Sequence, residues 1–108
     1  MSNLAELTDT DFQSTIESAS TPVLIDFHAT WCQPCKSLTP LIEAIAEEYA
    51  GKLEVRAVDI ENAGETAMRF GIQSVPTVVL FKNGQEVDRF IGLRDIKSIR
   101  EMVDKAIG

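Results

Sequence analysis

The feature of this sequence that most constrains its fold is the run VLIDF at residues 23–27, which is apolar except for Asp26. Strands with one face in water alternate apolar and polar residues, whereas strands covered on both faces are nearly continuous apolar runs. The run therefore predicts a strand that is buried on both faces, as in a parallel sheet. Helices must then cover both faces of that sheet.

Extended and helical patterns alternate along the rest of the chain. Extended patterns occupy residues 53–60, 77–81 and 86–91, with a short edge strand expected at residues 3–7. Helical patterns begin at Thr8, near Cys32, near Asn62 and near Ile96. Thr8 with an acidic residue three positions later resembles a capping box, and Asn83-Gly84 favours a tight hairpin. Right-handed crossovers would assemble these elements into a mixed sheet with helices on both faces.

Length and charge narrow the classes of protein to which this chain can belong. Its 108 residues fit one domain, so we expect a single domain over residues 1–108. A net charge of -7 is a poor match to phosphate backbones or anionic lipid, which argues against nucleic acid and membrane as partners. Residues 1–10 lack the basic start and apolar stretch of a signal peptide, which predicts a cytoplasmic protein.

The two cysteines, Cys32 and Cys35, lie where the second helix should begin, just after the apolar strand. The thiolate is the nucleophile in disulfide chemistry, and a helix N-terminus favours negative charge. Cys32 could attack a client disulfide, and Cys35 could then attack Cys32 and release the client. Two alternatives are a pair of thiols without a role and a metal half-site completed by His28. Because structural zinc sites use four ligands, we expect no metal here, and we expect no cofactor.

Asp26 is the anomaly within the apolar strand. A buried carboxylate is costly to ionise, so it either stays protonated or finds partners. Near a titrating pair of thiols, it could serve as a base. The alternative is an aspartate at the end of a strand whose side chain reaches solvent.

Several segments together resemble the thioredoxin family. The segment WCQPCK at residues 31–36 resembles its active-site segment, and the apolar strand before it is similar to the strand in that family. The segment VPT at residues 75–77 resembles its cis-proline segment, and FKNG at residues 81–84 resembles its hairpin. The resemblance runs the full chain. It implies an α/β thioredoxin fold, with a central mixed β-sheet flanked by helices on both faces.

The resemblance also implies an activity and roles for individual residues. The protein would be a monomeric protein-disulfide reductase that acts on disulfide-containing client proteins and is recycled by a thioredoxin reductase. Cys32 would be the attacking thiol, Cys35 the resolving thiol, and Asp26 the carboxylate that assists proton transfer at Cys35. The substrate-binding residues that it implies are Trp31, Gln33, Pro34, Val75, Pro76 and Gly92.

From the residues alone, some of these assignments have plainer alternatives. Trp31 could be core packing, although its place beside Cys32 favours an exposed contact residue. Pro76 could follow an ordinary trans bond, which is the commoner state, whereas the resemblance implies a cis Val75–Pro76 bond. Beyond reduction, the chain could be a related oxidase or isomerase, or a binding module without catalysis.

Three positions depart from the family pattern. Gln33 stands where the family usually has glycine, and Ala57 stands where it often has lysine. His28 stands where it often has tryptophan or another aromatic residue. His28 either fills an aromatic-sized space or adds a group that titrates near neutral pH to the site. The first departure can shift the redox potential, and the other two can change how protons are handled around Asp26.

Overall fold

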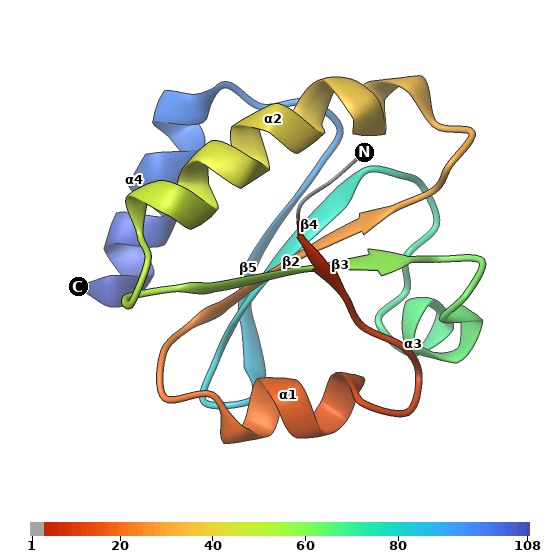
Figure 1. Ribbon diagram of the computed structural model, residues 1–108, viewed down its shortest axis with the longest axis horizontal. Coiled ribbons are helices and arrows are strands. Elements are labelled where there is room, and N and C mark those ends of the chain that lie inside the picture. The colour runs from red at the N-terminus through yellow and green to blue at the C-terminus, as the bar shows by residue number, and fades with distance from the viewer. Residues whose placement is uncertain (1–3) are drawn as a thin grey trace.

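The computed structural model describes residues 4–108, whose strands form one mixed sheet of five strands (Figure 1). The strands are β1 (Ala5–Glu6), β2 (Val23–His28), β3 (Glu54–Asp59), β4 (Thr77–Lys82) and β5 (Gln85–Ile91). Their order across the sheet is β1-β3-β2-β4-β5. β1 and β2 both run parallel to β3, whereas β4 is antiparallel to β2 and to β5. The predicted mixed sheet is therefore confirmed.

The helices form a layer on each face of this sheet. They are α1 (Phe12–Ser18), α2 (Gln33–Glu48), α3 (Gly64–Arg69) and α4 (Ile96–Ile107). α2 and α4 lie together on one face, and α1 and α3 lie on the other (Figure 1). The chain therefore has the α/β architecture that its sequence pattern predicts.

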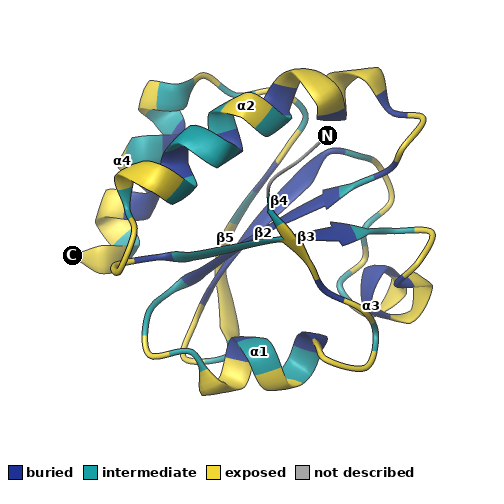
Figure 2. Ribbon diagram, viewed as in Figure 1, coloured by how far each residue is buried: buried dark blue, intermediate teal, exposed yellow. Residues whose placement is uncertain are grey.

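The central strand β2 is packed on both faces, as the apolar run predicts. Its residues from Val23 to Phe27 are all buried (Figure 2). Leu24 belongs to a core cluster with Leu38 and Ile42 of α2. The side chains that alternate with it belong to a second cluster with α1, and they are Val23, Ile25 and Phe27. Side chains alternate across a strand, so this packing requires apolar residues in both phases.

Near the N-terminus, the bounds of β1 and α1 differ in detail from those predicted. The expected edge strand at residues 3–7 is observed at Ala5–Glu6, and Asn3 lies outside the described residues. α1 begins at Phe12 rather than at Thr8, although the Phe12 N–H donates to the Thr8 carbonyl at 3.1 Å. The Asp11 carboxylate accepts hydrogen bonds from the N–H and the hydroxyl of Thr8. Half of the predicted capping box is thus present, in the turn before the helix.

The predicted start of α2 and the predicted hairpin are both observed. α2 has Cys32 as its N-cap, contains Pro40, and ends before Gly51, which has a φ of 86°. Asn83 and Gly84 have φ values of 54° and 78°, as a tight hairpin between two strands requires. Because β2 leads directly into α2, the first turn of α2 lies at the carboxyl end of the central strand (Figure 1).

We predict that the layer between α2 and the sheet carries much of the stability. Ile42 is fully buried there, so Ile42→Ala should lower the free energy of unfolding by about 2–5 kcal/mol. Met68 of α3 is 82% exposed and serves as a control, since Met68→Ala should change this quantity by less than about 0.5 kcal/mol. Urea unfolding followed by circular dichroism measures both. Equal losses in the two variants would contradict the assigned core.

Candidate active site

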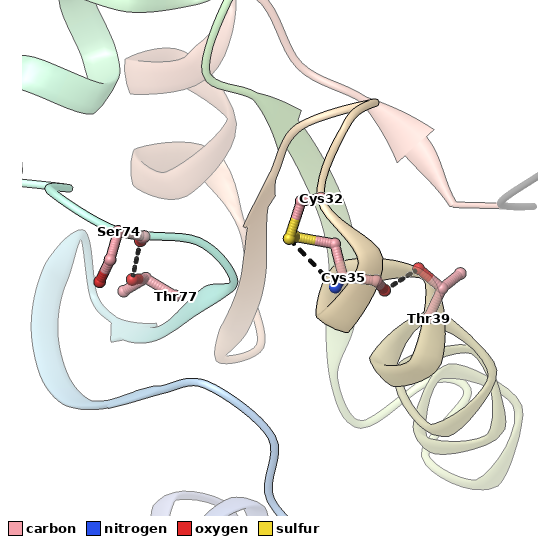
Figure 3. The surroundings of a disulfide bond; sticks show 5 residues. All are labelled: Cys32, Cys35, Thr39, Ser74 and Thr77. Atoms are coloured by element: carbon pink, nitrogen blue, oxygen red, sulfur yellow. Dashed lines mark hydrogen bonds between the residues drawn. A yellow bond between two sulfur atoms is a disulfide. The ribbon is translucent and has the colours of Figure 1, made fainter.

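Cys32 and Cys35 form a disulfide at the start of α2, with their Cα atoms 5.3 Å apart (Figure 3). Cys32 is the N-cap residue and has an extended backbone. Its sulfur accepts a hydrogen bond from the Cys35 N–H at 3.2 Å (Figure 3). The first N–H groups of a helix have no partner within the helix, so a side chain at the N-cap satisfies one of them. The predicted placement of the pair at a helix start is confirmed.

This geometry distinguishes the two sulfurs chemically. The Cys32 sulfur lies at the positive end of the α2 dipole and accepts a backbone hydrogen bond, and both effects would favour a thiolate on Cys32 once the disulfide is reduced. Both sulfurs are covered in this disulfide form, since Cys32 is only 4% exposed and Cys35 is 2% exposed. Trp31 beside them is 65% exposed, so it is a surface residue and not core packing.

The loop that precedes β4 lies against the disulfide. Val75 packs on the cluster formed by Ala29, Cys32 and Cys35. The Val75–Pro76 peptide bond is cis, as the family resemblance implies. The Thr77 hydroxyl donates to the Ser74 carbonyl at 2.7 Å and so closes this turn (Figure 3). These contacts hold residues 74–77 next to the two sulfurs.

Gly92 is tied to the same turn, since its N–H donates to the Pro76 carbonyl at 2.8 Å. Its φ is 83°, a conformation that other residues rarely adopt, while the space beyond its Cα is open. Ile91 and Leu93 flank Gly92, are 63% and 59% exposed, and were not expected from the sequence. Exposure is a property of the folded chain, so no pattern in the sequence marks these two residues as surface residues.

Among the remaining residues implied for client binding, Gln33 and Pro34 are exposed, Val75 is half-buried and Pro76 is buried. The structure therefore brings two groups of these residues to the disulfide. One group surrounds Cys32 at the start of α2, and the other reaches it through the cis-proline turn.

Asp26 is buried behind this site, with 2% of its surface exposed. Its neighbours in register across the sheet are Ala57 of β3 and Val78 of β4, neither of which has a polar side chain. Among the described residues, its Oδ1 atom has no hydrogen-bond partner. Burial raises the pKa of Asp26 from 3.8 to about 6, against a smaller lowering by the charge of His28. The alternative of an aspartate that reaches solvent is therefore wrong.

His28 makes a contact that sequence reasoning missed. Its Nε2 atom lies 2.8 Å from the Oε2 atom of Glu6 on β1. Both residues line an open cleft of about 530 Å³, whose wall also includes Cys35 and Lys36. Glu6 is 22 positions away from His28 in the chain, and nothing local in the sequence signals that the two residues meet.

The metal half-site considered from the sequence is not assembled in this structure. Within residues 4–108, no group of three or more His, Cys, Asp or Glu side chains is placed to hold a metal ion. His28 pairs with Glu6, and the sulfurs of Cys32 and Cys35 are bonded to each other.

Among residues 4–108, no helix is both long and apolar enough to cross a membrane.

We predict that Asp26 makes the stability of the oxidised protein depend on pH. Because its pKa rises from 3.8 to about 6 on folding, its contribution is fully present below about pH 4 and is lost as the pH rises through 6. Asp26→Asn removes this dependence. Between about pH 4 and pH 8, the free energy of unfolding of the variant relative to that of the wild type should rise by on the order of 3 kcal/mol.

Urea unfolding at a series of pH values measures this difference. Glu61→Gln is the matched control, because it removes a carboxylate that is exposed to solvent. If the difference in free energy of unfolding between Asp26→Asn and the wild type does not change with pH, burial does not raise the pKa of Asp26.

Comparison with known proteins agrees with this site. Residues 3–105 match the family model described as Thioredoxin. Thioredoxins of Staphylococcus aureus strains MW2, N315 and COL are each 38% identical to this chain over 102 residues. Those residues span 94% of this chain and 96% of each relative. With its Cys-x-x-Cys disulfide at the start of α2, this chain belongs to the thioredoxin family of thiol–disulfide oxidoreductases.

Proposed function

We propose that this protein reduces disulfides in client proteins in two steps, with Cys32 as the attacking thiol and Cys35 as the resolving thiol. The observation that carries the assignment is the hydrogen bond from the Cys35 N–H to the Cys32 sulfur at the N-cap of α2. A helix N-terminus stabilises one thiolate of the pair, and here that thiolate is Cys32.

In the first step, the Cys32 thiolate attacks one sulfur of a client disulfide. A mixed disulfide forms between Cys32 and that sulfur, and the other client sulfur leaves as a thiolate that takes a proton from solvent. In the second step, Cys35 loses its proton and attacks the Cys32 sulfur. The disulfide between Cys32 and Cys35 closes, the bond from Cys32 to the client breaks, and the second client sulfur leaves as a thiolate that takes up a proton. Two electrons have then passed from the protein to the client.

Asp26 is the group that we propose accepts the proton of Cys35. It projects from β2 on the same side as Leu24, which packs against α2, the helix that carries Cys35. A carboxylate whose pKa is raised to about 6 can both take and return a proton near neutral pH. Burial, which is the cause of this raised pKa, is therefore also what suits Asp26 to the role.

The proposed client-binding surface surrounds the disulfide. Its residues are Trp31, Gln33, Pro34, Val75, Pro76 and Gly92. Support comes from the exposed indole of Trp31 on one side and from the cis-proline turn packed against the disulfide on the other. A large exposed apolar side chain beside a reactive sulfur suits a protein client, because aromatic residues are enriched at protein interfaces.

We also propose the setting in which this chemistry works. A thioredoxin reductase returns two electrons to the disulfide after each cycle. The cytoplasm keeps thiols reduced, so a protein that donates electrons to disulfides belongs there. Residues 1–108 act as one domain, which is supported by the single sheet that the described helices cover, and we propose that the protein works as a monomer.

We predict that Cys35→Ser traps clients. Without the resolving thiol, the mixed disulfide on Cys32 has no fast intramolecular exit. Incubation of the reduced variant with insulin should give an adduct that dithiothreitol releases, detected on a non-reducing gel. Cys32→Ser is the matched control and should give no adduct.

The same two variants should reduce insulin, with dithiothreitol as the source of electrons, no faster than dithiothreitol alone. Equal adduct with Cys32→Ser and Cys35→Ser would reverse or remove the assigned roles. Activity that survives in Cys32→Ser would refute the two-step mechanism.

A further inference from the structure

Asp26 needs a route by which protons reach solvent. In the oxidised protein, a group with a pKa of about 6 loses its proton above that pH, and it must regain one before Cys35 can leave as a thiol. Yet Asp26 is 2% exposed, and its neighbours in register on β3 and β4 are Ala57 and Val78. Neither side chain can carry a proton.

His28 is placed to provide this route. It lies two residues after Asp26 on β2, so both side chains project from the same face of the sheet. Its ring is 20% exposed, and it lines the same open cleft as Cys35. The ring is therefore partly exposed to solvent and lies on the same face of the sheet as the buried carboxylate.

Glu6 holds the ring in this place. The 2.8 Å contact between its Oε2 atom and the Nε2 atom of His28 fixes one ring nitrogen toward β1. When the ring gains a proton, the carboxylate of Glu6 balances the new positive charge. Both residues also interact electrostatically with Asp26, since the charge of His28 lowers its pKa and the charge of Glu6 raises it.

We propose that His28, positioned by Glu6, is the proton relay between Asp26 and solvent. This proposal rests on the role of Asp26 proposed above. It makes His28 a positioning residue that acts through Asp26 and does not contact the client. Imidazole suits the task, because one ring nitrogen can accept a proton while the other gives one up.

The steps balance in both directions. During client reduction, the Cys35 proton passes to the Asp26 carboxylate, then to the neutral ring of His28, and then to solvent. When a dithiol reduces the disulfide, His28 takes a proton from solvent and passes it to Asp26, which protonates Cys35 as it leaves. The relay moves no electrons, since these pass only between sulfur atoms.

Other charged groups surround His28 and must stay constant in any test. Lys36 and Glu43 of α2 line the same cleft. Asp59 of β3 is aligned with His28 in the register of the sheet. Because all three remain in every variant below, a change in pH dependence reports on the pair of Glu6 and His28.

The test measures reduction of the oxidised full-length protein by dithiothreitol in a stopped-flow instrument, from pH 5 to pH 8 at low buffer concentration. Fluorescence of Trp31, the only tryptophan, follows the adjacent disulfide. His28→Phe keeps an aromatic ring without nitrogen atoms, and it should slow the reaction about tenfold above pH 6. Glu6→Gln should slow it in the same pH range by a smaller factor.

Glu48→Gln is the matched control for Glu6→Gln. It breaks a surface ion pair of similar length, 2.7 Å to Arg100, at the far end of α2. It should leave both the rate and its pH dependence unchanged. Circular dichroism checks that each variant is folded, and Glu6→Gln still tests the relay if His28→Phe does not fold.

Chemical rescue separates a proton relay from packing. His28→Ala removes the ring from an open cleft, so added imidazole should restore the rate in proportion to its concentration. Imidazole should have no effect when Asp26→Asn is combined with His28→Ala. In the Asp26→Asn variant, adding His28→Ala should not slow the reaction further, because the effects of substituting residues that act in series are not additive.

The outcomes separate the two proposals. If Asp26→Asn reacts as fast as the wild type at every pH, the proposed role of Asp26 is wrong. If Asp26→Asn is slow but His28→Phe and Glu6→Gln keep the wild-type pH profile, the relay is wrong and His28 only fills space. A uniform slowing that imidazole does not rescue would equally overturn the relay.

Discussion

The burial of β2 between two layers of helices is the constraint on which the rest of this structure depends. Residues 23–27 are buried in both phases of the strand, so α1 must cover one face and α2 the other. The chain leaves the carboxyl end of β2 and enters α2 within a few residues, which puts Cys32 at the N-cap. The same burial surrounds Asp26 with apolar neighbours and raises its pKa. One packing requirement thus places both the sulfur pair and the carboxylate.

The site combines two electrostatic effects of opposite sign within a short distance along the chain. At Cys32, the start of a helix favours negative charge and so favours the reactive thiolate. At Asp26, the loss of contact with water opposes negative charge and so raises the pKa of the carboxyl group to about 6. In the proposed mechanism, the thiol pair loses and regains one proton per cycle and uses both conditions. The first depends on the helix backbone, and the second depends on the layers that exclude water.

Much of the fold could be predicted because its signals are local. The apolar run of β2 and the hairpin at Asn83-Gly84 depend on residues close together in sequence, and each lies where it was expected. The predicted start of α1 was wrong, and the burial of Cys32 was not predicted. The Asp11 carboxylate binds Thr8 in a turn before the helix begins. Cys32 is covered because Val75, which is distant in sequence, packs on its cluster.

The sequence by itself determined the order of elements, the start of α2 at the cysteine pair and an acidic group within the central strand, because these follow from periodicity and helix capping. The tertiary structure decided which groups meet across the chain. It joins Glu6 to His28, Gly92 to Pro76, and Asp9 to the backbone N–H of Thr66. Such pairs depend on the register of strands and the path of loops, which arise only when the core closes. Their members carry no mark in the sequence, because a hydrogen-bond partner is chosen by distance in space and not along the chain.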